Sequence, residues 1–204
     1  MKLYKNLQTA LKERTDVRAI KLTLKDKVFP PELFNLSNLE EAYFDGACED
    51  FPSSIVGWEK LKVLSLKFEK NTSDLSAVFS LPSLENLKII ETPIKVFLLP
   101  LGRINAPLRF VTIKGCGLER LPEEISMLNT LEELHLPQNK LFVLPFSFQD
   151  LRSLKRINLD SNRFVIFPKI VKKMPNLKHL SIDGNTFDEE EKAKIQREFH
   201  IWPN

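Results

Sequence analysis

Leu131-Glu-Glu-Leu134-His-Leu136, followed by Asn139, is one unit of a pattern that recurs along most of this 204-residue chain. Alignment on Leu-x-x-Leu-x-Leu gives units that begin at Val17, Leu39, Leu61, Leu84, Leu108, Leu131, Leu154 and Leu177. Successive starts lie 22, 22, 23, 24, 23, 23 and 23 residues apart. A period in this range predicts a stack of similar coils rather than a globule.

Each unit predicts one short strand with its apolar residues on one side. Side chains alternate between the two faces of a strand, so the leucines point inward and the intervening residues point outward. One coil cannot bury its apolar side alone, but stacked coils form a continuous core with a parallel ladder of strands along one side. We expect positions 2, 3, 5, 7 and 8 of each unit to face outward.

The ninth position of the units carries a polar side chain where the chain is expected to turn inward. It is Asn139, Asn162 and Asn185 in the last three units, whereas earlier units carry Thr92 and Cys116. An amide side chain can donate and accept, so stacked asparagines can satisfy main-chain groups that would otherwise be buried without partners.

Proline marks the second half of several units, as in Leu121-Pro122, Leu144-Pro145 and Phe167-Pro168. Proline sets φ and can begin a helical turn without wasting a main-chain donor. We therefore expect short helical or 3₁₀ segments on the side of each coil opposite the strand.

These residues resemble the leucine-rich-repeat family, in its 23-residue class with the pattern LxxLxLxxNxLxxLPxxI. They are most similar to bacterial members of that class, and they also resemble the Ras-group repeats of eukaryotes. The resemblance covers about residues 17–187. It implies an α/β leucine-rich-repeat solenoid: a horseshoe arc with a parallel β-ladder on the concave face, short helical or 3₁₀ segments on the convex face, and helical caps.

Both ends of the chain predict helices that cover the terminal coils. Leu3, Leu7 and Leu11 recur at helical spacing, which predicts a helix over residues 3–13. Asp188 precedes three glutamates and is therefore expected to be the N-cap of a second helix. We expect a single domain over residues 1–204, made of an N-terminal helical cap (1–16), eight repeats (17–187) and a C-terminal helical cap (188–204).

The sequence contains no recognised motif for catalysis or cofactor binding. The patterns GxSxG, GxxxxGK[ST], GxGxxG and HExxH are all absent. His135 and His179 lie two units apart, roughly 10 Å at the usual strand spacing, with no third ligand nearby. We therefore expect no enzymatic activity, no cofactor and no bound metal.

Charge and hydropathy limit the expected partners and location. The net charge of +3 comes from 30 basic and 27 acidic residues, a balance that does not favour nucleic-acid binding. No apolar run approaches the roughly 20 residues that cross a bilayer, so membrane insertion is not expected. Met1-Lys2-Leu3-Tyr4-Lys5 carries charges where a signal peptide is apolar. We expect a cytoplasmic protein, or a secreted one if a leader has been removed.

The predicted function is a non-catalytic protein–protein interaction module that binds a macromolecular partner on its concave face, as solenoids present such surfaces. Apolar residues at outward positions indicate a contact patch, because exposed apolar clusters often mark interaction sites. The predicted partner-binding residues are Tyr43, Val63, Lys67, Phe68, Lys88, Ile90, Phe110, Lys114, Glu133, His135 and Arg156.

Two alternatives stay open at this point. A one-residue slip of register in the irregular units would turn Phe68 and Ile90 inward. The function could also be narrower: the substrate-recognition part of a bacterial effector enzyme, or a secreted or surface-exposed adhesin that binds host proteins.

Overall fold

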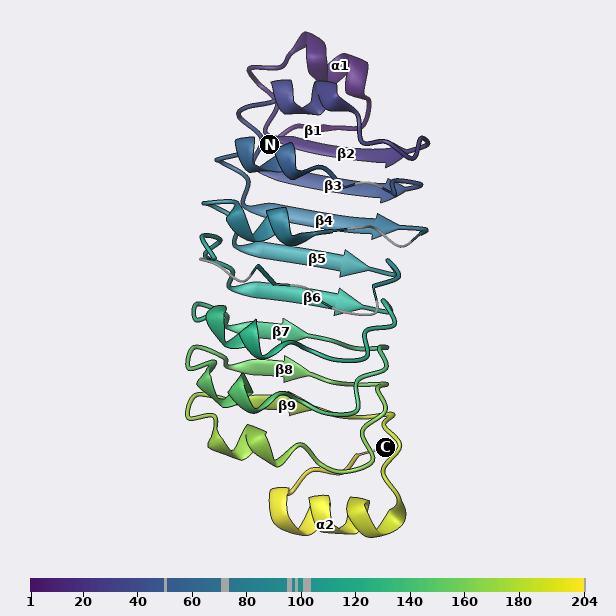
Figure 1. Ribbon diagram of the computed structural model, residues 1–204, viewed down its shortest axis with the longest axis vertical. Helices are drawn as coiled ribbons and strands as arrows, with labels where there is room; N and C mark the ends of the chain where they lie inside the picture. The colour runs from purple at the N-terminus through teal and green to yellow at the C-terminus, as the bar shows by residue number, and fades with distance from the viewer. Residues whose placement is uncertain (50, 71–73, 95–96, 98, 101–103, 204) are drawn as a thin grey trace.

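The computed structural model describes residues 1–49, 51–70, 74–94, 97, 99–100 and 104–203. Within these residues, the strands form one parallel sheet of nine whose spatial order is the chain order (Figure 1). They are β1 (Leu3–Tyr4), β2 (Ala19–Leu24), β3 (Glu41–Gly46), β4 (Val63–Phe68), β5 (Asn86–Ile90), β6 (Phe110–Lys114), β7 (Glu133–His135), β8 (Arg156–Asn158) and β9 (His179–Ser181).

The sheet register aligns equivalent positions of successive units. Leu64 pairs with Leu87, Leu87 with Val111, and Val111 with Leu134. The residue steps between paired positions equal the spacings of the sequence repeat. The inward residues of neighbouring coils therefore stack into one continuous apolar core, and the predicted solenoid with its parallel ladder is confirmed.

Short 3₁₀ helices form a second column, stacked along the solenoid (Figure 1). Five of the six described turns begin at or directly after a proline, which pre-sets φ for a helical start. The turns are η1 (Pro31–Asn35), η2 (Ser53–Gly57), η3 (Ser76–Ser80), η4 (Glu123–Met127), η5 (Phe146–Asp150) and η6 (Lys169–Lys173).

The ninth-position asparagines tie each coil to the one before it. The buried Asn139 side chain accepts hydrogen bonds from the main-chain amides of Cys116 and Leu118, at 3.1 Å each. It also donates to the main-chain carbonyl of Ile113 at 2.7 Å. Asn162 repeats this pattern one coil later. As predicted, the amide side chains satisfy main-chain groups that the coil buries.

Thr92 and Cys116 perform part of the same task where asparagine is missing. The Thr92 hydroxyl accepts from the main-chain amide of Phe68 at 2.8 Å. The Cys116 thiol donates to the carbonyls of Lys114 at 3.3 Å and Ile89 at 3.4 Å. Both side chains offer fewer hydrogen-bonding groups than an amide, so they satisfy fewer main-chain groups than Asn139 does.

The N-terminal segment departs from its sequence prediction. The helix expected from residue 3 is α1 (Leu7–Lys12), capped by the Asn6 side chain, which accepts from the Thr9 amide at 3.0 Å. Leu3 and Tyr4 instead form β1 and pair with β2. Tyr4 is buried, so pairing with the first coil outweighs the local helical spacing.

The C-terminal segment contains α2 (Glu189–Phe199), which lies across the end of the last coil (Figure 1). The Asp188 side chain accepts from the Glu191 amide at 2.8 Å and is the predicted N-cap. Ile195 is fully buried against the core, whereas Trp202 remains 64% exposed.

The prediction that Phe68 faces outward is wrong. β4 continues through Phe68, so alternation places this side chain on the same inward side as Leu64 and Leu66. Phe68 is fully buried, with its ring centroid 6.2 Å from that of Phe51. Ile90 occupies the seventh position of its unit, so alternation keeps it on the outward side, where it is half-buried. The eighth position is therefore inward wherever the strand extends that far.

Candidate binding surface

The face of the sheet that points away from the core, called the concave face below, is built from rows of equivalent positions. The third-position row is Ala19, Glu41, Val63, Asn86, Phe110, Glu133, Arg156 and His179. The fifth-position row is Lys21, Tyr43, Ser65, Lys88, Thr112, His135, Asn158 and Ser181.

The strands β4–β6 carry a mixed apolar and basic patch. Val63 and Phe110 lie in the same row, two strands apart, and both are half-buried. Ile90 pairs with Lys114 on the neighbouring strand, and Lys88 lies exposed in the fifth-position row, two residues before Ile90 on β5. Apolar side chains on a face that otherwise contacts water mark this patch as the surface best suited to a partner.

Flanking charges hold parts of this patch in place. The Lys67 ammonium lies 2.6 Å from the Glu91 carboxylate, and the Arg109 guanidinium lies 5.3 Å from the centroid of the Phe110 ring. Tyr43 donates to Glu41 at 2.9 Å, and burial is the main cause that raises the pKa of the Tyr43 phenol. The phenol therefore stays neutral and able to donate at physiological pH.

The strands β7–β9 carry a polar network instead. Glu133 lies 3.2 Å from the imidazole of His135 and 3.7 Å from the guanidinium of Arg156. One coil further, Asp160 accepts from the Ser181 hydroxyl at 2.6 Å and from the Asn158 amide at 2.8 Å. This half of the face thus offers hydrogen-bonding groups that are already ordered by one another.

The structure places ten of the eleven predicted contact residues on the concave face. Phe68 is the exception, since it belongs to the core. Seven of the ten, which are the apolar side chains, the tyrosine and the lysines, lie on β3–β6, and the other three lie next to them on β7 and β8. The first group is Tyr43, Val63, Lys67, Lys88, Ile90, Phe110 and Lys114, and the second is Glu133, His135 and Arg156.

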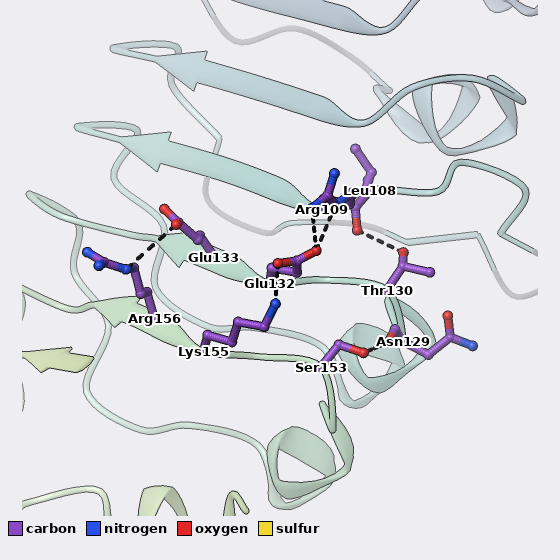
Figure 2. Close-up of polar contacts among 9 residues, drawn as sticks. All are labelled: Leu108, Arg109, Asn129, Thr130, Glu132, Glu133, Ser153, Lys155 and Arg156. Carbon is purple, nitrogen blue, oxygen red and sulfur yellow. Dashed lines mark hydrogen bonds and ion pairs between the residues drawn. The ribbon is translucent and has the colours of Figure 1, made fainter. Parts of the chain in front are cut away.

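Sequence reasoning overlooked a row of charges at the second position, just before each strand. It consists of Arg18, Glu40, Lys62, Glu85, Arg109, Glu132, Lys155 and Lys178, called the charge row below. Figure 2 shows Glu132 between Arg109 at 2.7 Å and Lys155 at 2.5 Å. Glu40 lies in the same way between Arg18 at 2.9 Å and Lys62 at 3.0 Å. The alternating signs were readable from the aligned units.

These ion pairs shift the titration of the acids. Hydrogen bonds from Lys155, and then from Arg109, hold the pKa of the Glu132 carboxyl below its usual range. The Glu132 side chain is only 21% exposed, whereas its two cations are about half exposed. The carboxylate of Glu132 is thus less accessible to solvent than its two partners, whose long side chains cover it.

A groove of about 560 Å³ opens beside the last part of the charge row. Its charged lining residues are Arg109, Glu132, Arg152, Lys155 and Lys178. The hydroxyls at its edge are engaged by the main chain: Thr130 donates to Leu108 and Ser153 donates to Asn129, as Figure 2 shows. The cationic side chains are therefore the groups that this groove presents to a ligand.

A second apolar cluster lies outside the concave face, where the chain leaves β7 and β8. Phe142 and Val143 occupy the same positions in their coil as Val165 and Ile166 do in the next, and these four side chains border a cleft of about 380 Å³. Arg120 and Lys173 lie over two of its rings, at 5.3 and 5.5 Å from the centroids. The cluster is Phe142, Val143, Phe146, Val165 and Ile166, all between 45% and 67% exposed.

The described part of the chain carries neither a cluster of metal ligands nor a membrane-spanning helix. Among these residues, no group of three or more His, Cys, Asp or Glu side chains is placed to hold a metal ion. No helix in the same residues is both long and apolar enough to cross a membrane.

Comparison with known proteins finds relatives in sequence. No protein-family model matches the chain. The mouse volume-regulated anion channel subunit LRRC8B is 32% identical over 137 residues, which are 64% of this chain and 17% of that protein. The human subunit LRRC8E is 29% identical over 145 residues, which are 67% of this chain and 18% of that protein. The chain thus spans about a sixth of the length of these relatives.

Solved structures show the same architecture. The leucine-rich-repeat ectodomain of the Arabidopsis thaliana receptor kinase GASSHO1/SCHENGEN3 superposes with a TM-score of 0.66 at 20% identity, covering 90% of this chain and 23% of that one. The plant peptide hormone receptor RGFR1 superposes with a TM-score of 0.63 at 17% identity, covering 91% and 35%. Together with the parallel ladder and its register, this likeness shows that the chain has the leucine-rich-repeat solenoid fold.

Proposed function

We propose that this chain is a non-catalytic interaction module that binds a protein partner on its concave face. The observation that carries the proposal is the patch on β4–β6, where the half-buried side chains of Val63, Ile90 and Phe110 lie at outward positions beside Lys88 and Lys114. An apolar surface in contact with water gains free energy when a partner covers it.

The physical properties of the patch suit protein recognition. An aromatic ring beside cationic side chains is a typical anchor in protein interfaces. The strands that carry these side chains are held in register by neighbours on both sides, so binding costs little conformational entropy. The adjoining polar network of Glu133, His135 and Arg156 supplies ordered hydrogen-bonding groups at the edge of the contact.

The solved structures of the same fold support this role. GASSHO1/SCHENGEN3 was solved in complex with CASPARIAN STRIP INTEGRITY FACTOR 2, and RGFR1 in complex with RGF2. Both are plant receptors that were solved in complex with another molecule. Our proposal for this chain is the same kind of action: recognition without a chemical step and without a cofactor or metal, and with no role for nucleic acid or membrane insertion.

Three finer predictions from the sequence also belong to this proposal. They are membership of the 23-residue repeat class, the likeness to bacterial members, and a cytoplasmic location. The relatives described above come from mouse and human. The effector-enzyme role predicts an attached catalytic domain, which the mass of the native protein would reveal. The adhesin role predicts export from the cell, which cell fractionation separates from a cytoplasmic location.

The test compares one substitution on the concave face with one outside it. Phe110→Asp places a charge in the proposed patch, and Phe146→Asp makes the same change in the exposed cluster after β7. Each variant and the parent protein are immobilised at equal density, exposed to an extract of the source cells, and the captured proteins are quantified by mass spectrometry. Thermal melting of each variant shows that it is folded.

We expect Phe110→Asp to capture at least about tenfold less of the specific partner than the parent protein does, and Phe146→Asp to capture as much as the parent. The reason is that an uncompensated charge in a buried contact costs more than about 1.4 kcal/mol of binding free energy. Equal capture by the parent protein and Phe110→Asp would overturn the concave-face proposal. Loss of the partner in Phe146→Asp alone would move the interface to the second apolar cluster.

A further inference from the structure

The charge row alternates in sign along almost the whole solenoid, and this alternation is broken only at its last position. From Arg18 to Lys155, each charged residue is followed one coil later by its opposite. The next position after Lys155 should be acidic, but it is Lys178. Opposite charges on neighbouring strands stabilise a ladder and like charges destabilise it, so this step costs stability that the rest of the row gains.

Lys155 and Lys178 occupy equivalent positions on neighbouring coils, just before β8 and β9. The Lys178 amide donates to the Lys155 carbonyl at 2.8 Å, and neighbouring strands lie roughly 4.8 Å apart. Lys155 has its ion pair with Glu132 on the far side, at 2.5 Å. The Lys178 ammonium makes no ion pair with any residue that the structure describes, and it is exposed. The interval between the two side chains therefore lacks its negative charge.

The groove beside this interval concentrates the charge of the protein. Arg109, Arg152, Lys155 and Lys178 line it with a single carboxylate, Glu132, so its lining carries a net charge of +3. The whole chain also has a net charge of +3. The charges outside the groove therefore sum to zero, and the groove lining carries a local excess of positive charge that attracts an anionic ligand.

The row itself shows which ligand fits such an interval. One coil earlier, a carboxylate is held between Arg109 at 2.7 Å and Lys155 at 2.5 Å. The interval between Lys155 and Lys178 has the same strand spacing and two cations, but no acid of its own. A carboxylate supplied from outside would complete the alternation with charge-assisted hydrogen bonds.

We propose that the groove binds an acidic peptide segment, whose carboxylate lies between Lys155 and Lys178 and whose neighbouring acids face Arg152. This inference rests on the proposed function, since the segment belongs to the protein partner. The groove lies at the start of β6–β9, next to the concave face, so one partner can cover both surfaces.

A fluorescently labelled hexaglutamate peptide is the probe, with binding measured by fluorescence polarisation at low ionic strength. Lys178→Glu supplies the missing acid from the protein itself, and Lys140→Glu makes the same charge change at an exposed lysine outside the groove. We expect Lys178→Glu to weaken binding at least about tenfold and Lys140→Glu less than about threefold. Lys178→Glu should melt no lower than the parent protein, because it completes the alternation.

Three results would overturn the inference. The parent protein could fail to bind hexaglutamate, or both variants could lose affinity equally, which would indicate bulk charge alone. A phosphoserine peptide or an RNA oligonucleotide could bind more than about tenfold tighter than hexaglutamate, which would assign the groove to phosphate.

The capture experiment separates this inference from the proposed function. If Phe110→Asp loses the partner and Lys178→Glu keeps it, the concave-face proposal stands and the acidic segment is wrong. If both lose it, the partner contacts both surfaces. If neither loses it, the concave-face proposal fails, and the hexaglutamate measurement alone decides whether the groove binds carboxylates.

Discussion

The side-chain oxygen of Asn139 accepts a hydrogen bond from the main-chain amide of Cys116, one coil earlier in the chain, at 3.1 Å. The same oxygen accepts from Leu118, and the Asn139 amide group donates to three carbonyls. Removing this side chain leaves several buried main-chain groups without partners. We expect Asn139→Ala to lower the free energy of unfolding by about 2–4 kcal/mol.

Urea denaturation followed by circular dichroism measures this loss, with Asn129→Ala as the control. Asn129 is exposed, and its main-chain carbonyl, not its side chain, accepts from Ser153. The control should change the free energy of unfolding by less than about 0.5 kcal/mol. Equal stability of Asn139→Ala and the parent protein would contradict the role of the asparagine column.

Phe68 and Phe110 distinguish the inward from the outward side of the sheet. Phe68 is fully buried in the core, so we expect Phe68→Ala to cost about 3–5 kcal/mol by leaving a cavity. Phe110 lies half-buried on the concave face and contacts Arg109, so Phe110→Ala should cost less than about 1.5 kcal/mol. Chemical denaturation of the two variants compares them, and a larger loss for Phe110→Ala would mean that the register of the sheet is different.

The pKa of Glu132 depends on its two cations. Lys155 is the main cause that lowers it, so Lys155→Met should raise the Glu132 pKa toward the ordinary glutamate value of about 4.3. Because the folded-state pKa is lowered, this carboxylate contributes stability above the unfolded pKa and loses that contribution as pH falls through the folded pKa. Carboxyl-carbon NMR titration measures the shift. Lys140→Met, which touches no part of the charge row, should leave the Glu132 pKa unchanged.

Cys116 should be a poor nucleophile in the folded protein. Burial raises the pKa of its thiol to about 11, so little thiolate exists at pH 8. We expect iodoacetamide to modify Cys116 slowly in the native protein and quickly in concentrated urea, as peptide mass spectrometry can follow. Stability should decline as pH rises from about 8.5 toward 11, because the unfolded thiol ionises first. Rapid native modification at Cys116 would show that the side chain is accessible.

Local pattern was sufficient for the repeating part of the fold. The apolar positions of a unit such as Leu131, Leu134 and Leu136 are set by the alternation of a strand and need no knowledge of distant residues. The asparagine column and Asp188 at the start of α2 follow equally from short-range chemistry, since a cap and an amide bond satisfy groups that any such coil exposes.

The candidate surface was only partly readable in this way. Outward positions three, five and seven were predicted from alternation, and Val63, Ile90 and Phe110 do lie on the concave face. The position of Phe68 depended on where β4 ends. The strand extends to Phe68 because that residue pairs with Gly46 on β3 and its amide donates to Thr92 in the following coil. Neither partner is near in sequence.

The period, the inward aliphatic positions and hence the solenoid follow from the amino-acid order alone, because these depend on side-chain alternation within one coil. Three other features became visible in the folded chain: Leu3–Tyr4 adds a strand to the sheet, Phe68 belongs to the core, and Arg152 and Lys178 line one groove. Each of these depends on how neighbouring coils stack, and stacking brings together residues more than a dozen positions apart, whose contacts a local pattern does not contain.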